Sequence, residues 1–311
     1  MEQSGTDITK ASELLKEGKI VGIPTETVYG LAADALNAAA VVSIFEAKQR
    51  PSFDPLIVHI GAVSQLKQLV GDVSPLQQKL IDKFWPGPLT IIFDKNEIIP
   101  DIVTSGLKTV GIRMPQHPIT LKLLRDFDLC LAAPSANPFG YISPTSADHV
   151  IKQLGDKVEY VLDGGPSEIG LESTIVRCDN HQITVLRLGG LSIDALSDFG
   201  VPVVVSDHSS SSPQAPGMLT NHYSPRKKTS YLHSASEIAE NTAVLYFSKE
   251  SQRAVDRTLS KSGDLREAAR NLFKYLRELD ELEITEIFVE KAPDNGLGKA
   301  INDRLKRATA S

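Results

Sequence analysis

The sequence predicts an α/β protein in which an open, twisted, mixed sheet is followed by a second, smaller βαβ Rossmann-like unit. Short apolar runs, typical of buried strands, interleave with segments of helical periodicity, but not as a strict βαβ series. A stretch rich in Ser, Pro and Gly at 206–217 divides the 311-residue chain. A length of this size favours two domains.

The elements of the first unit follow from these two patterns. Gly18 lies just past the first expected helix, and Pro51 requires that the second has already ended. Helices are expected at 8–18, 38–48, 63–69, 75–84 and 119–125. Strands are expected at 20–23, 56–60, 89–93, 110–113, 129–133, 160–162, 173–178 and 182–187.

The second unit shows a strand, helix, strand, helix pattern. Strands are expected at 242–247 and 286–289. Asp264 is the expected N-cap of a strongly amphipathic helix, with Glu267 at the reciprocal capping position. We therefore expect domains at 1–206 and 229–311, joined by a linker or lid at 207–228.

Composition narrows the function classes. The net charge is −6, from 33 basic and 39 acidic residues, so composition gives no argument for nucleic-acid binding, although a local basic groove stays open. Cys130 and Cys178 lie far apart without metal-ligand spacing, which favours a reduced, cytoplasmic protein with no protein-built metal site. The N-terminus does not resemble a signal peptide, and no apolar run approaches the roughly 18 residues of a membrane span.

Lys48 and Arg50 place two cations in one turn between a predicted helix and Pro51. Arginine offers a planar fork and lysine a point charge, a common combination on a polyphosphate. The alternative is an ordinary helix end, where cations are favourable in any case.

Polar residues also follow the predicted strands. Ser135 and Asn137 come after the strand at 129–133, and the crevice beyond strand ends binds ligands in open α/β sheets. Thr27, His59 and Arg113 stand in similar places, and Arg113 is suited to clamp a carboxylate. Turn chemistry, a structural histidine and a surface ion pair are the alternatives.

Taken together, these motifs resemble the threonylcarbamoyl-AMP synthase family of the long, two-domain type, whose first domain is YrdC-like. The matching patterns are Pro-Thr-Glu-Thr-Val-Tyr-Gly-Leu at 24–31, Lys-x-Arg at 48–50, Ser-x-Asn at 135–137, His-Tyr-Ser-Pro at 222–225 and Ala-Ile-Asn-Asp-Arg-Leu at 300–305. They span almost the whole chain.

The resemblance implies a nucleotidyltransferase that makes L-threonylcarbamoyladenylate from L-threonine, bicarbonate and ATP and releases pyrophosphate. The product would pass to a tRNA threonylcarbamoyltransferase complex that modifies tRNA next to the anticodon, and tRNA itself is a candidate partner. No membrane partner is implied. Mg²⁺ would be held mainly by the phosphates, with no metal ligand from the protein.

The resemblance also assigns site residues. Lys48 and Arg50 would face the phosphates as the catalytic pair. The threonine pocket would consist of Thr27, His59, Arg113, Ala133 and Ser173. ATP would contact Arg50, Asp54, Thr109, Ser135, Asn137, Ser143, Arg187 and Tyr223, the last from the expected lid.

The chain departs from the family at two places. Asp54 stands where relatives usually carry Asn, so it is a candidate for ATP or for Mg²⁺. The segment before His222-Tyr223 lacks the basic residues that are common there, which weakens any claim that the linker touches phosphate or RNA. Two other functions stay open: a non-catalytic RNA- or ribosome-binding module, and a carbamoyl-transfer factor with another acceptor.

Overall fold

A long mixed sheet forms the first unit of the protein. The computed structural model describes residues 3–179, 181–206, 223–234 and 238–310. Over these residues the large sheet has 11 strands in the order β1-β8-β2-β3-β7-β4-β6-β5-β9-β10-β11. They are β1 (Ser4–Gly5), β2 (Val21–Ile23), β3 (Gly30–Asp34), β4 (Ile57–His59), β5 (Leu89–Asp94), β6 (Thr109–Arg113), β7 (Leu131–Ala132), β8 (Tyr160–Leu162), β9 (Thr174–Cys178), β10 (Ile183–Arg187) and β11 (Val203–Val205).

Helices pack on this sheet and begin at polar caps. The side chains of Asp7, Asn37 and Ser74 accept backbone N–H groups at the starts of α1, α2 and α4. The α-helices are α1 (Ile8–Lys16), α2 (Ala38–Lys48), α3 (Leu66–Leu69), α4 (Pro75–Phe84), α5 (Asp101–Thr104), α6 (Pro118–Asp126) and α7 (Ala147–Leu154). Short 3₁₀ helices are η1 (Val63–Gln65), η2 (Gly155–Lys157) and η3 (Ile193–Phe199).

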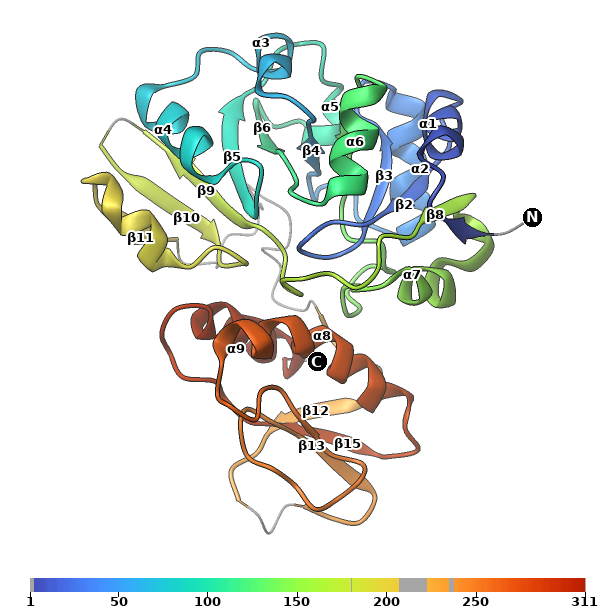
Figure 1. Ribbon diagram of the computed structural model, residues 1–311, viewed down its shortest axis with the longest axis vertical. Coiled ribbons are helices and arrows are strands. Elements are labelled where there is room, and N and C mark those ends of the chain that lie inside the picture. Colours follow the sequence, from blue (N-terminus) through green and yellow to red (C-terminus); the bar gives the residue numbers. More distant parts are fainter. Residues whose placement is uncertain (1–2, 180, 207–222, 235–237, 311) are drawn as a thin grey trace.

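The C-terminal unit is a parallel sheet with two helices. Its order is β12-β15-β13-β14, made of β12 (Lys228–Tyr231), β13 (Thr242–Tyr246), β14 (Arg257–Thr258) and β15 (Glu286–Val289). The helices are α8 (Leu265–Glu281) and α9 (Gly298–Ala308). Both helices lie between this small sheet and the first unit (Figure 1). Asp264 caps α8 as predicted, but Glu267 does not complete the box directly, because its carboxylate binds Ser260, whose Oγ in turn accepts the Asp264 N–H.

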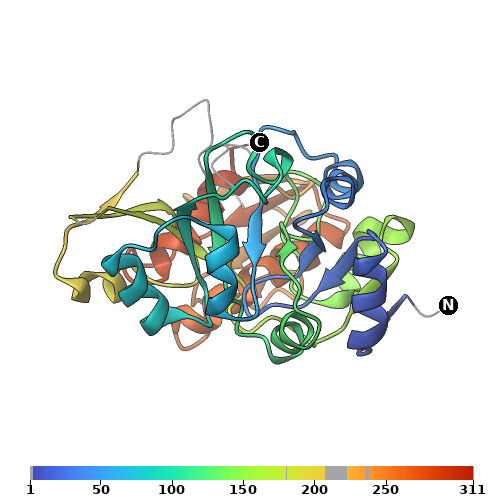
Figure 2. The same ribbon diagram turned by 90° about the horizontal axis from the view of Figure 1, so that it is seen from above.

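The two units share a hydrophobic core. Val28, Ile142 and Leu171 of the first unit belong to the same buried cluster as Leu272 and Phe273 of α8. Viewed from above, the C-terminal unit lies beneath the centre of the large sheet, between its two ends (Figure 2). Apolar surface of this kind is removed from water only while the units stay together.

The predicted fold class, a mixed sheet followed by a smaller parallel sheet, is confirmed. Several elements are not among the predictions: the strands β1, β3, β11, β12 and β14, the helices α5 and α7, and the short 3₁₀ helices η2 and η3. The small residues of β3 carry little strand preference, and its pairing with β2 and β7 decides its conformation. The expected linker lies outside the described residues except for 223–228, so its extent stays a prediction.

Cys130 and Cys178 are both free thiols. None of the helices in the described part of the chain is long and apolar enough to cross a membrane.

Candidate active site between the two units

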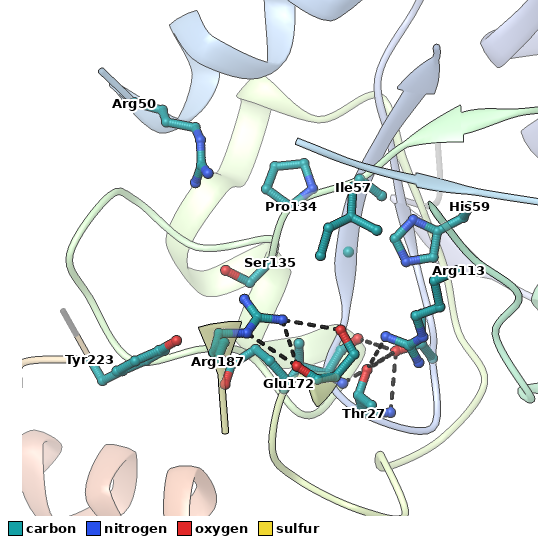
Figure 3. A pocket seen from close by; sticks show the side chains of 15 residues that line it. Thr27, Arg50, Ile57, His59, Arg113, Pro134, Ser135, Glu172, Arg187 and Tyr223 are labelled. Carbon is teal, nitrogen blue, oxygen red and sulfur yellow. Dashed lines mark hydrogen bonds between the residues drawn. The ribbon is translucent and has the colours of Figure 1, made fainter. Parts of the chain in front are cut away.

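A small cavity of about 50 Å³ lies over one face of the large sheet (Figure 3). Its lining includes most of the residues that the sequence predicts for a site: Thr27, Arg50, His59, Arg113, Ala133, Ser135, Ser173, Arg187 and Tyr223. It also includes Thr25 and Gly30 of the motif at 24–31, together with four residues to which no site role was assigned: Val28, Ile57, Pro134 and Glu172.

The cavity covers a sheet face near strand ends: His59, Arg113 and Arg187 in its lining are the last residues of β4, β6 and β10. Ile57 and His59 are two residues apart on β4, so their side chains point to the same face of the sheet. Arg113 is the cross-strand partner of His59, and the Ala133 N–H bonds the Ile57 carbonyl. The short strand β4 runs antiparallel to β7 and parallel to β6, so the start of one strand and the ends of others meet at this place in the sheet.

Arg113 is fixed by three contacts. Its guanidinium forms a buried ion pair with Glu26 at 2.5 Å, donates to the Thr27 hydroxyl at 2.8 Å, and donates from Nε to the Gly87 carbonyl at 3.2 Å. Arginine has five N–H groups, so two remain for a ligand. The Thr27 hydroxyl is itself within 2.7 Å of the Thr25 hydroxyl.

His59 is buried beside Arg113, and its Nδ1 has no hydrogen-bond partner among the described residues. Burial first, and then the positive charge of Arg113, lower the pKa of His59 to about 3. The imidazole is therefore neutral near pH 7. It can accept or donate a hydrogen bond to a ligand, but it is too weak a base to remove a proton from an ammonium group.

Arg50 reaches the cavity from the turn after α2, where Gln49 adopts a left-handed conformation with φ 53°. Its NH2 group is 2.9 Å from Asp54 Oδ2, and it also donates to the carbonyls of Asp54 and Pro55. Asp54 therefore neutralises Arg50 and does not line the cavity.

Lys48 lies behind the cavity and is almost completely buried. Its ammonium group donates to the carbonyls of Ser135 and Asn137, so it supports the loop that presents Ser135. Burial, followed by the charge of Arg50, lowers the pKa of Lys48 well below its usual range. Asn137 is turned away from the lining and donates to the carbonyls of Pro138 and Tyr141.

Arg187, at the end of β10, approaches the cavity from the opposite side. It donates to the Ser173 carbonyl from Nε at 3.1 Å and from NH2 at 2.9 Å, and also to the Ser173 hydroxyl. That hydroxyl is 2.8 Å from the hydroxyl of Thr90. Burial lowers the pKa of Arg187 to about 10, so the group stays charged at neutral pH.

Glu172 is a buried carboxylate in the lining that the sequence analysis did not select. Its Oε1 accepts from the Ser143 hydroxyl at 2.5 Å, and its Oε2 accepts from Arg304 Nε at 3.0 Å. An ionised carboxylate can only accept hydrogen bonds, so the Ser143 hydroxyl must be the donor to Glu172. Ser143 can then act toward a ligand only as an acceptor. The available signal was an acidic residue directly before an apolar strand.

Tyr223 closes the cavity on the side of the C-terminal unit (Figure 3). Its ring stacks on Phe273 at a centroid distance of 5.4 Å, and the Arg304 guanidinium lies 4.8 Å from its centroid. Its backbone has φ 67°, which is uncommon for a bulky residue. Burial raises the pKa of Tyr223, so the phenol is neutral.

Thr109 is a predicted site residue that lies away from the cavity, at the opposite end of its strand from Arg113. It begins β6, four residues before Arg113 and on the same face, about 13 Å away by strand geometry. Lys48, Asp54, Asn137 and Ser143 surround the cavity without lining it. Their direct contact with a ligand stays a prediction.

Charge and size describe what the cavity can accept. Three guanidinium groups line it, from Arg50, Arg113 and Arg187, against the carboxylate of Glu172. Asp54 and Glu26 pair with the first two from outside the lining and reduce the positive charge, but Arg304 balances Glu172, so a positive excess remains. That excess favours an anion. The volume suits water or a small ligand, since drug-sized ligands occupy roughly 300–1,000 Å³. A nucleotide is larger than this cavity, so neighbouring groups would have to move or most of the nucleotide would lie outside it.

Comparison with known proteins gives matches along the whole chain. The Sua5, YciO and YrdC family profile, described as "Telomere recombination", matches residues 13–189. A profile described as "Threonylcarbamoyl-AMP synthase, C-terminal domain" matches residues 184–310.

Individual relatives show the same pattern. Threonylcarbamoyl-AMP synthase of Pyrococcus abyssi is 37% identical, with 96% of this chain and 93% of the relative covered. The Bacillus subtilis protein of that name is 39% identical, with 97% and 92% covered. The crystal structure of P. abyssi Sua5 complexed with L-threonine matches with a TM-score of 0.91 at 36% identity and covers 97% of this chain and 94% of that chain.

Proposed function

Because this chain belongs to the threonylcarbamoyl-AMP synthase family, in its two-domain form, we propose that it joins L-threonine, bicarbonate and ATP into threonylcarbamoyl-adenylate and releases pyrophosphate. The product would then serve threonylcarbamoyl transfer to tRNA next to the anticodon. The observation that carries the proposal is the set of three buried arginines around one cavity, beside a neutral histidine and several hydroxyls.

Threonine fits the side of the cavity that holds Arg113 and His59. Two N–H groups of Arg113 remain for the carboxylate, in a fork whose direction Glu26 and Thr27 already fix. Neutral His59 can hydrogen-bond the amino or hydroxyl group of the substrate. Ala133 and Ile57 supply apolar surface for the methyl group, which contributes only about 1–3 kcal/mol of preference over serine.

ATP fits the side that holds Arg50, Ser135 and Arg187. The threonine amine would add to CO₂ from bicarbonate, and an oxygen of the resulting carbamate would attack the α-phosphorus as pyrophosphate leaves. Positioning and charge neutralisation dominate in-line displacements of this kind. Arg50 and Arg187 can neutralise the phosphates, while Lys48 keeps the Ser135 loop in place.

Mg²⁺ is expected to arrive on the ATP phosphates. The carboxylates nearest the cavity are held by cations, Glu172 by Arg304 and Asp54 by Arg50. Among the residues that the structure describes, no group of three or more His, Cys, Asp or Glu side chains is placed to hold a metal ion.

The test is pyrophosphate release by the purified chain with ATP, Mg²⁺ and bicarbonate, with and without L-threonine. We expect strict dependence on threonine and a large loss in Arg50→Ala and Lys48→Ala. Lys19→Ala, at an exposed ion pair, is the control. Turnover without threonine would indicate another acceptor, and no turnover by the folded protein would favour the RNA-binding alternative.

A further inference from the structure

Arg304 is a fully buried cation on α9, outside the first unit and outside the cavity lining. Burying a charge is costly unless it is paired and hydrogen-bonded. Each nitrogen of the Arg304 guanidinium has a partner: Nε donates to Glu172 at 3.0 Å, NH1 donates to Asp303 at 2.5 Å, and NH2 donates to the Leu188 carbonyl at 2.8 Å.

Two of its contacts end in the cavity. Glu172 and Tyr223 both line the site, and Arg304 touches the carboxylate of one and the ring face of the other. Phe273 of α8 stacks on the same Tyr223 ring. The C-terminal unit therefore holds this wall of the cavity through both of its helices.

The contact also reaches a predicted nucleotide residue. Glu172 accepts a hydrogen bond from the Ser143 hydroxyl, and Arg277 of α8 donates to the Ser143 and Ile142 carbonyls. Removal of Arg304 would leave Glu172 with Ser143 and the more distant charge of Arg187.

From these contacts we infer that Arg304 is a positioning residue, which fixes Glu172, and through it Ser143, together with the Tyr223 ring, so that the C-terminal unit completes the ATP side of the site. This inference rests on the proposed function and extends it to a residue that does not touch the substrates. It also gives the C-terminal unit a definite task in the reaction.

Electrostatics agree with this role. Burial works to raise the pKa of Glu172, but Arg304 and Arg187 outweigh it and hold that pKa below its usual range. The neutral phenol of Tyr223 also lies close enough to Glu172 for the two groups to interact. Without Arg304, the pKa of Glu172 should rise. As the pH is lowered, Glu172 would then become protonated earlier, and any activity that needs the ionised carboxylate would be lost at a higher pH than in the wild type.

The experiment is a double-mutant cycle on the full chain with Arg304→Met, Glu172→Gln and both together, read as threonine-dependent pyrophosphate release. We expect each single variant to raise the KM for ATP at least tenfold with a smaller change in kcat. The double variant should stay within about twofold of the worse single variant, because the two side chains act as one unit. Arg304→Lys, which keeps the charge, should recover part of the loss.

The pH profile separates positioning from simple support of the fold. In Arg304→Met the acid limb of kcat/KM for ATP should move to higher pH, and in Glu172→Gln that limb should vanish. Arg257→Met removes another ion pair of the C-terminal unit, with Glu278 at 2.7 Å, and should leave kinetics and profile unchanged. If Arg304→Met does not fold, Arg304→Lys completes the cycle with Glu172→Gln.

Three results would overturn the inference. They are wild-type kinetics and pH profile in Arg304→Met, losses in the double variant that equal the product of the single losses, or equal effects of Arg257→Met. A wild-type chain without threonine-dependent turnover would instead remove the proposed function, and this inference with it.

Discussion

Arg50 and Asp54 form an ion pair of 2.9 Å in which both side chains are almost completely buried. The Asp54 carboxylate neutralises Arg50, which is the cation that the turn at 48–54 contributes to the cavity lining. Since Arg50 also donates to the carbonyls of Asp54 and Pro55, its position does not depend on the carboxylate alone. The main effect of Asp54 is therefore on the net charge that a phosphate would meet at Arg50. It has less effect on the position of the Arg50 guanidinium.

Asp54→Asn should strengthen ATP binding. Loss of the negative charge leaves Arg50 free to pair with phosphate, and we expect the Kd for ATP to fall about threefold to tenfold, which corresponds to about 1 kcal/mol. The protein without ATP should be less stable, because a buried cation has lost its partner. Thermal unfolding with and without MgATP measures both effects. Asp101→Asn, at the exposed pair with Lys95, is the control; a smaller ATP-induced shift in Asp54→Asn than in wild type would refute the prediction.

Lys48→Met should act on the Ser135 loop. Two carbonyls lose their buried donor, so the free energy of unfolding should fall by about 2–4 kcal/mol. ATP binding should weaken more than threonine binding, because the loop lies on the nucleotide side. Calorimetric titration of each substrate checks this. Lys157→Met removes a lysine–carbonyl contact at the neighbouring Ala47 on the surface and should change little.

Arg113→Lys should impair threonine use. A lysine cannot replace the three bonds to Gly87, Thr27 and Glu26 and still offer a fork to a carboxylate. We expect kcat/KM for threonine to fall about 100-fold, equivalent to one or two charged hydrogen bonds, while the Kd for ATP stays nearly unchanged. Arg125→Lys, at the Gly61 carbonyl, is the matched control. Equal losses for both substrates would argue against a carboxylate clamp.

His59 should make the protein sensitive to acid. Its pKa is about 3 in the folded chain and about 6.5 when unfolded, so the unfolded state binds the proton more readily between these values. Stability from this group is complete above pH 6.5 and is lost as the pH falls, by about 2 kcal/mol at pH 5.

His59→Gln should therefore lose less stability between pH 7 and pH 5 than wild type does. Urea unfolding at the two pH values measures the difference. His181→Gln alters an exposed side chain and should follow the wild type. An unchanged pH slope in His59→Gln would contradict the buried, neutral state of the imidazole.

Much of the fold was predictable because it depends on local patterns. The amphipathic helix α8 and its Asp264 cap follow from periodicity and side-chain chemistry alone. The strand β3 could not be predicted, since its small residues become a strand only by pairing with β2, which precedes it, and with β7, which is distant in sequence.

The candidate site was predictable as a set of residues but not as a geometry. Arg50, His59, Arg113 and Ser135 do meet in one cavity. The position of Lys48 behind the loop and the pairing of Asp54 with Arg50 depend on burial, which a linear motif does not encode. The position of Glu172 in the lining depends on its hydrogen bond with Arg304, which lies 132 residues later in the chain, so the local sequence does not indicate it.

The core that both units share has a thermodynamic consequence. Val28, Ile142 and Leu171 would face water if the C-terminal unit detached, and Glu172 would lose its buried counter-charge. Two sheets that look separable are therefore expected to melt as one cooperative unit, with a single heat-absorption peak. A chain shortened to the first unit would expose an apolar patch that favours aggregation. Polar substitutions in that patch would be needed to keep the shortened chain monomeric.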